Sequence, residues 1–208
     1  MMHLFKRVMD FNLDWLVLLK TSIMLFVIMD PPGNIPIFIA VTRGMKNEER
    51  KRELNHAVIV ASILLLLFAF IGKLVLGVLG ITLDSFKIAG GILLLLVSFD
   101  LLRGEHKYGV RGEPGVGVGA VPIGTPLLAG PGAITAVMVI IQQPYGVGVV
   151  LFSIFFAIIA TRFLLGQSER IFGILGKMGA EVLSRVIGII IAAIAIQFIG
   201  AGIKGMFF

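Results

Sequence analysis

Long apolar runs separated by short polar loops make up most of the chain. A helix needs about 20 mainly apolar residues to cross a membrane, and six runs approach this length. They cover residues 16–41, 58–79, 83–102, 120–141, 147–165 and 182–203. The pattern therefore predicts an all-α, polytopic membrane protein with six transmembrane helices, in which residues 1–208 form a single transmembrane domain.

The first apolar run contains the segment MDPPGNIPIF at residues 29–38. Proline removes a backbone donor, and it pushes the residue before it out of helical geometry. We therefore expect an interruption at 30–36, with one half-helix ending near Met29 and the next beginning near Asn34. Asn34 is a suitable N-cap for that second half-helix.

The fourth run is interrupted in the same way. It contains Pro122 and Pro126, followed by Gly130, Pro131 and Gly132. We expect the first part of this run to end just before Gly130 and the helix to restart near Gly132. Both the first and the fourth helices are thus predicted to be discontinuous.

The two halves of the chain resemble each other. Three pairs of segments match in the same order: PPGNIPIF (31–38) with GPGAITAV (130–137), LGVLG (76–80) with FGILG (172–176), and FKIAGG (86–91) with SRVIGI (184–189). Each half carries three spans, so the second half enters the membrane from the opposite side. We therefore predict inverted repeats at 14–103 and 120–205, joined by a Gly-rich loop at 104–119. Inverted repeats are widespread among secondary transporters, whose substrates bind near the midplane at discontinuous helices.

The charged residues lie mainly in the loops between the apolar runs. The net charge is +6, but positive charge in short loops of a membrane protein sets topology and does not indicate nucleic-acid binding. Loops 42–55, 103–119 and 166–180 carry ten Lys and Arg residues, against at most five on the other side. We therefore predict a multi-pass protein of the cell membrane, with these loops in the cytoplasm and both termini outside. The absence of cysteine excludes disulfides and thiolate metal sites.

The two interruptions point to an internal polar site. Non-helical backbone inside a membrane is tolerated only when it is buried in protein or lines a wet cavity. The N–H groups that begin a half-helix suit a carboxylate, and the carbonyls that end one suit an ammonium group or a cation. A small zwitterion fits both, although a pair of proline kinks without a ligand is the alternative. The candidate binding residues are Asp30, Pro32, Gly33, Asn34, Gly130, Pro131, Gly132, Ala133 and Thr135.

Asp30 is an acid deep inside an apolar run, where an ionisable residue usually has a function. It could neutralise a substrate ammonium group, carry a coupled proton, or cap the break by accepting backbone N–H groups. The sequence leaves these three roles open. Thr125 and Thr135 flank the second break, and either could line the same cavity.

MDPPGNIPIFIAVT and GTPLLAGPGAITAV together resemble the MarC family of integral membrane proteins, which includes the small neutral amino-acid transporter SnatA. The resemblance extends to IAGGILLLLVSFDLL in the third span and to RVIGIIIAAIAIQFIGAGI in the sixth. It implies six spans with outside termini and transport of glycine and alanine-like substrates, coupled to protons. Sodium coupling, the direction of transport and the oligomeric state, including a homo-oligomer, stay open.

Three other function classes compete with an amino-acid transporter. An ion-conducting channel also uses broken helices, but it usually needs a symmetric filter or a ring of charges. A membrane-embedded enzyme would need a metal cluster or paired carboxylates, which the sequence does not supply. An exporter of another small zwitterionic metabolite would share the same site. We therefore expect no enzymatic activity, no cofactor, no metal and no nucleic-acid partner, and we expect the lipid bilayer to be the surrounding phase.

Overall fold

The computed structural model describes residues 15–104, 128–143 and 146–207, and these ranges contain helices and no strand. The helices are α2 (Trp15–Met29), α3 (Pro31–Val41), α4 (Asn47–Val78), α5 (Leu83–Arg103), α6 (Pro131–Ile140), α7 (Gly146–Gly166) and α8 (Ser168–Phe207). The first half of the fourth apolar run lies outside the described residues, together with Pro122, Thr125, Pro126 and the loop after Gly104.

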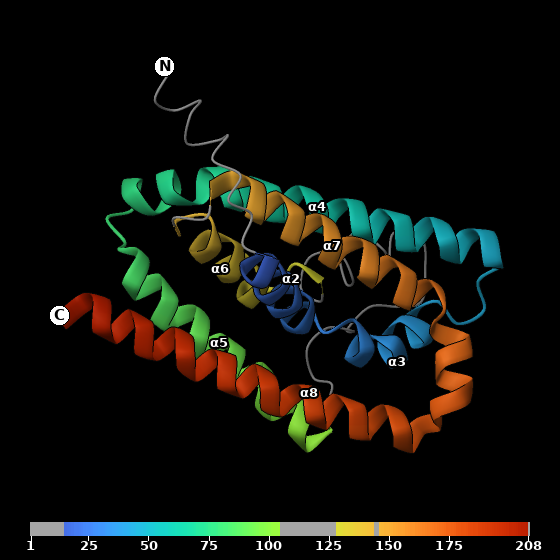
Figure 1. Ribbon diagram of the computed structural model, residues 1–208. Coiled ribbons are helices and arrows are strands. Elements are labelled where there is room, and N and C mark those ends of the chain that lie inside the picture. The colour runs from blue at the N-terminus through green and yellow to red at the C-terminus, as the bar shows by residue number, and fades with distance from the viewer. Residues whose placement is uncertain (1–14, 105–127, 144–145, 208) are drawn as a thin grey trace.

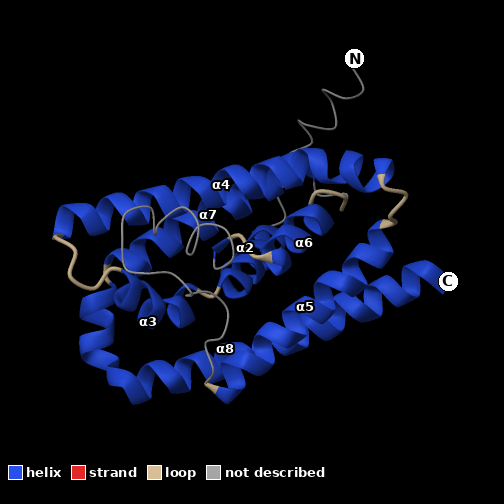
Figure 2. Cartoon of the chain, turned by 180° about the vertical axis from the view of Figure 1, so that it is seen from behind, coloured by secondary structure: helices blue, strands red, loops and turns tan. Residues whose placement is uncertain are grey.

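The helices are arranged with the short ones between two layers of long ones. In Figures 1 and 2, α4 and α7 form one layer and α5 and α8 form the other, while α2, α3 and α6 lie between them. The last turns of α3 and α7 and the first turns of α4 and α8 gather at one end of the molecule. The end of α4, the start of α5 and the end of α8 lie at the opposite end.

Length and composition make five of the helical segments able to cross a membrane, with α2 and α3 counted as one, and α6 is a shorter apolar helix. Large apolar side chains on the long helices point outward, as at Leu74, Phe155 and Phe163, which are 64–69% exposed. Such a surface suits lipid and would be costly in water. The prediction of a polytopic, all-helical membrane protein of about six helices is confirmed.

α5 runs antiparallel to the second part of α8 and packs against it. Six of the buried residues on α8 recur at alternating spacings of four and three, the pattern of a two-helix seam: Ser184, Gly188, Ile191, Ala195, Phe198 and Gly202. A methyl group on Gly91 of α5 would lie only 2.8 Å from the carbonyl oxygen of Ala195. Small residues therefore let the two backbones approach closely, as at other membrane helix interfaces.

Most predicted boundaries agree with the structure to within one or two residues. α4 begins at Asn47, so the charged segment before residue 58 extends the helix beyond the apolar run and shortens the predicted loop at 42–55. The predicted loop at 166–180 is wrong, because α8 begins at Ser168 and only turns at Gly176, whose φ is 64°. The residues between these positions carry the chain from one layer to the other as a helix (Figure 1). A helix that connects two layers does not need an apolar run of membrane-spanning length, so the length of the apolar runs does not predict this segment.

Candidate functional site

The first interruption consists of one residue. α2 ends at Met29, α3 begins at Pro31, and only Asp30 between them is non-helical, with φ 44° and ψ 56°. The prediction of a break over 30–36 with a restart near Asn34 is therefore wrong. Prolines at the first positions of a helix cost nothing, because the N–H groups they lack would have no helical partner there. α3 thus begins directly with two prolines and tolerates Pro36 inside it.

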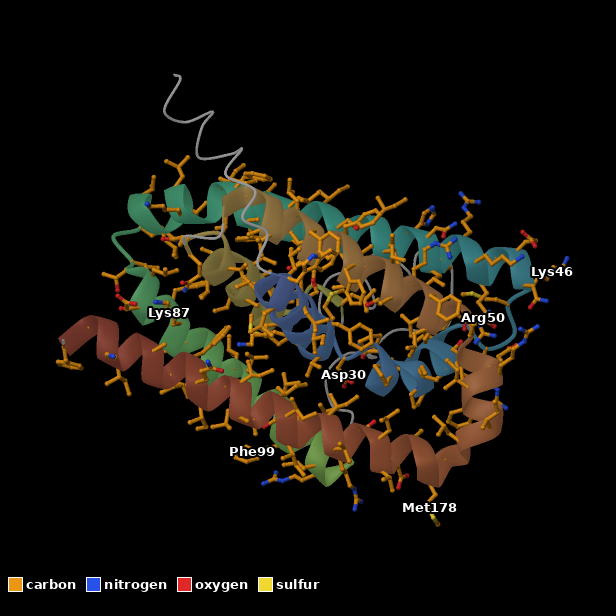
Figure 3. The ribbon with its side chains drawn as sticks, viewed as in Figure 1. Asp30, Lys46, Arg50, Lys87, Phe99 and Met178 are labelled. Atoms are coloured by element: carbon orange, nitrogen blue, oxygen red, sulfur yellow. The ribbon has the colours of Figure 1, made fainter. Side chains whose placement is uncertain are left out.

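Asp30 is the N-cap of α3, the position that the sequence assigned to Asn34. Its Oδ1 accepts the N–H of Gly33 at 3.0 Å, and the residue is 7% exposed. A side chain at residue 33 would overlap the Asp30 carboxylate. Of the three roles considered for this acid, capping is the one that the geometry displays. Figure 3 places Asp30 between α2 and α3, near the middle of the molecule.

Asn34 closes the same break from the other side. Its side chain is buried, and Nδ2 donates to the carbonyl of Met29, the last residue of α2, at 3.0 Å. Its backbone N–H donates to the carbonyl of Asp30 at 3.1 Å. The N–H groups of Gly33 and Asn34 are therefore both engaged within the chain. This arrangement leaves no place for a substrate carboxylate at the start of α3.

The carbonyl of Ile28, near the end of α2, lacks the hydrogen-bond donor that a continuous helix would supply. The N–H of Asp30 donates to the carbonyls of Phe26 and Val27, at 3.1 Å each. In a continuous helix the carbonyl of Ile28 would accept from residue 32, but Pro32 has no N–H. The N–H groups of Asp30, Gly33 and Asn34 donate to other acceptors than the Ile28 carbonyl. The Ile28 carbonyl is thus an acceptor that has lost its helical donor.

The second interruption precedes α6, which begins at Pro131, one residue before the predicted restart at Gly132. The N-cap is Gly130, so no side chain caps this helix. The N–H groups of Gly132 and Ala133 lie in its first turn, and both residues are buried. The two half-helices therefore differ, because α3 has an acid at its positive end and α6 has none.

The two interruptions lie against each other. A methyl group on Gly132 would come within 3.3 Å of Cγ2 of Ile28 and would overlap the side chain of Leu94 on α5. The first turn of α6 is therefore packed between the last turn of α2 and the middle of α5. This contact brings the uncapped start of α6 next to the residue whose carbonyl has lost its donor.

Thr135 takes a structural position one turn further along α6. The residue is 1% exposed, and Oγ1 donates to the carbonyl of Pro131 at 2.8 Å. Its side chain fills the space beside Gly90 of α5. The hydroxyl is thus turned to its own helix, and nothing in this geometry directs it to a ligand.

Sequence reasoning missed a cluster of hydroxyl groups buried between α2 and α7. Thr21 Oγ1 and Ser153 Oγ are 2.8 Å apart, and Ser22 Oγ donates to Ser153 Oγ at 3.4 Å. Two turns further along α7, Thr161 is fully buried, and its hydroxyl has no partner among the described residues. Ser153, Ala157 and Thr161 recur at intervals of four, and this spacing of small and polar residues is the signal that could have revealed the interface.

Comparisons with known proteins identify the group to which this arrangement belongs. The family model for the MarC family of integral membrane proteins matches residues 15–207. The chain belongs to the MarC family. The matched range includes α2, α3 and α6, which flank the two interruptions.

Other members of the MarC family are similar over almost the whole chain. The UPF0056 membrane protein MJ1677 of Methanocaldococcus jannaschii is 38% identical over 93% of this chain and 98% of its own length. YvbG of Bacillus subtilis is 32% identical over 89% and 93%, and YhcE of Escherichia coli is 33% identical over 93% and 95%. No solved structure matches the chain. In the described ranges, no group of three or more His, Cys, Asp or Glu side chains could hold a metal ion.

Proposed function

We propose that this member of the MarC family is a secondary active transporter of small neutral amino acids, glycine and alanine among them. It moves them across the cell membrane by alternating access, with protons as the coupling ion.

The contact between Gly132 and Ile28 carries this proposal. Through this side-chain contact, the uncapped, positive start of α6, which offers hydrogen-bond donors, packs against the last turn of α2, whose negative end offers acceptors. A zwitterionic amino acid needs both, since its carboxylate accepts hydrogen bonds and its ammonium group donates them. We assign the carboxylate to the N–H groups of Gly132 and Ala133, and the ammonium group to the carbonyl of Ile28.

The surroundings of Gly132 favour a small substrate. Ile28 and Leu94 already occupy the space that a single methyl group on Gly132 would need. A ligand that inserts here has to displace these two apolar side chains, and the displacement grows with the size of the ligand. Glycine and alanine therefore fit this site better than leucine or phenylalanine.

Asp30 is the candidate for the coupled proton. It is buried within the membrane-spanning part of the chain, and no ion pair joins it to a cation among the described residues. Because Asp30 caps α3 through a single oxygen, the second oxygen is available to a proton or to the substrate ammonium group. The same residue would then link proton binding to the geometry of the break.

The arrangement of helices supports alternating access between two halves. α3 packs against α8 and α7, and α6 packs against α5 and α4, which are the equivalent helices of the other half in the predicted repeat. Two similar units of opposite orientation can rock against each other around a shared site. With segments 42–55, 103–119 and 166–180 on the cytoplasmic side, this motion would expose the breaks to each side in turn.

Uptake measurements on proteoliposomes test the proposal. We expect labelled glycine to accumulate when a proton gradient is imposed, and alanine to compete with it while leucine does not. A current that flows without any substrate would favour a channel. Glycine accumulation that follows a sodium gradient and ignores the proton gradient would contradict the assigned coupling ion.

A further inference from the structure

A pocket of about 320 Å³ opens where the last turn of α3, the first turns of α4 and the α7–α8 corner meet. Its polar lining carries both signs of charge, with Arg50 and Lys51 from α4 and with Glu169 and Arg170 from the start of α8. Its volume falls within the range of small-molecule sites, about 300–1,000 Å³. Both signs of charge are present, so the lining offers a partner to each charged group of a zwitterion, although its three cations outnumber the single acid.

The bottom of the pocket is apolar and tightly closed. Phe38, Leu54 and Leu165 line it, and each is at most 3% exposed. They come from α3, α4 and α7, so they join the first half of the chain to the second. Phe38 lies eight residues after Asp30, which places it about 12 Å along α3 from the break. The pocket is therefore separated from the candidate substrate site by this layer of side chains.

Arg50 on α4 contacts the start of α8 next to this apolar layer and so connects the two halves of the chain. It forms an ion pair with Glu169 at the start of α8, and its Nη2 donates to Ser168 Oγ at 3.3 Å. Its guanidinium group also lies 5.2 Å from the centre of the Phe38 ring. The Arg50 side chain is 14% exposed and that of Glu169 is 69% exposed, so solvent partly screens this ion pair. Figure 3 shows Arg50 at the end of the molecule where α3, α4 and α7 converge.

We propose that this pocket is the vestibule through which the substrate reaches the helix breaks from this face, and that the Arg50–Glu169 contact is the latch that keeps it shut. The inference rests on the proposed transport function, which it deepens by naming the route and the closing device. Release of the latch lets the two halves separate at this end, and Phe38, Leu54 and Leu165 then part to open the path to Asp30.

Thiol labelling tests the latch cleanly, because the chain has no cysteine of its own. The reporter is Leu165→Cys, which places one thiol in the fully buried floor of the pocket. The rate of its reaction with a small charged thiol reagent is measured on the detergent-purified full chain. Adding Arg50→Gln should raise this rate about two- to fivefold, the factor that corresponds to the loss of one partly exposed ion pair. Glu169→Gln should raise it in the same way.

The matched control is Lys51→Gln, which removes the same charge one residue further along α4. Lys51 pairs with Glu48 of its own helix at 3.1 Å and does not join the two halves. We expect Lys51→Gln to leave the labelling rate of residue 165 unchanged. The charge exchange Arg50→Glu with Glu169→Arg should label more slowly than Arg50→Glu alone, since only the pair restores the attraction across the pocket.

A second reporter, Leu76→Cys, distinguishes opening of the latch from general loosening. Leu76 is buried near the opposite end of α4, about 33 Å from Leu54 by the helical rise. Its labelling rate should not increase in Arg50→Gln. An increase at both reporters, an equal effect of Lys51→Gln, or no effect of Arg50→Gln on residue 165 would overturn the proposal.

The outcomes separate the vestibule from the transport function. If glycine binds and is taken up while Arg50→Gln leaves the labelling rate at residue 165 unchanged, the transport function stands and the latch is wrong. If Arg50→Gln raises the labelling rate at residue 165 only, in a protein that binds no amino acid, the latch is supported and the proposed substrate is wrong.

Discussion

The carboxylate of Asp30 occupies the space beside Gly33 that any side chain at that position would need, and its Oδ1 accepts the Gly33 N–H at 3.0 Å. The acid and the glycine therefore form one unit. Asp30 can turn the chain with a positive φ and cap α3 only because residue 33 has no side chain. The segment that interrupts the first span is thus defined by a local contact as much as by its prolines.

Asp30→Asn should separate the charge of this residue from its role as a cap. Asparagine caps helices as well as aspartate and tolerates a left-handed backbone, so we expect a thermal unfolding midpoint close to that of the parent. Asp30→Ala loses the cap, at about 0.5–2 kcal/mol, and strains the left-handed backbone, so its midpoint should fall clearly. If Asp30 carries the coupled proton, the Asn variant should take up glycine without dependence on the proton gradient. Normal gradient-dependent uptake by this variant would refute that role.

Gly33→Ala should destabilise the protein through its overlap with the Asp30 carboxylate. In an Asp30→Gly background the carboxylate is gone and the backbone at residue 30 is still allowed, so the same substitution should cost less. Residues in contact typically show interaction energies of about 0.5–3 kcal/mol in such a cycle. Unfolding in detergent, measured on the four proteins, gives this energy directly. Additive effects would show that the two residues are not in contact.

Gly132→Ala should be destabilising because its methyl group overlaps Leu94. Adding a methylene-sized group to a packed interior costs about 1–3 kcal/mol. Leu94→Ala opens space on α5, so the loss in the double variant should be smaller than the sum of the two single losses. We expect the double variant to fold yet bind glycine weakly, since the added methyl group stands beside the proposed carboxylate site. Full recovery of glycine affinity in the double variant would place the substrate elsewhere.

Asn34→Asp should destabilise the protein although the two side chains have almost the same size. An ionised aspartate cannot donate to the carbonyl of Met29, and it adds a second acid beside Asp30. A buried polar group that loses its partner costs about 1–3 kcal/mol. The effect should appear as a lower unfolding midpoint at neutral pH. The isosteric Asn34→Leu removes the donor without adding charge and should cost less than Asn34→Asp.

The sequence predicts the architecture well because apolar length and proline position are coarse, additive signals. The extents of α5 and α7 follow from where apolar residues begin and end, whereas α4 begins in a charged segment before its apolar run. The details at the breaks depend on which groups compete for the same hydrogen bonds. Asn34 and Asp30 are both good caps, and only the backbone geometry shows that Asp30 caps α3 while Asn34 donates to Met29.

Contacts between distant segments are the part that the sequence could not provide. The packing of Gly132 against Leu94 and Ile28 and the pairing of Thr21 with Ser153 each join different helices. The composition of one helix does not reveal the partner on another. The inverted relation of the two halves and the orientation of the termini stay predictions, as does the likeness to SnatA within the family.

Calorimetric titration of the purified chain with glycine tests the central claim most directly, with glycinamide and N-acetylglycine as matched ligands that each lack one charge. The account predicts saturable binding of glycine and no binding of either analogue, since the site needs a carboxylate and an ammonium group together. Absence of glycine binding by the folded protein, or equal binding of an analogue, would contradict a zwitterion site between the two breaks.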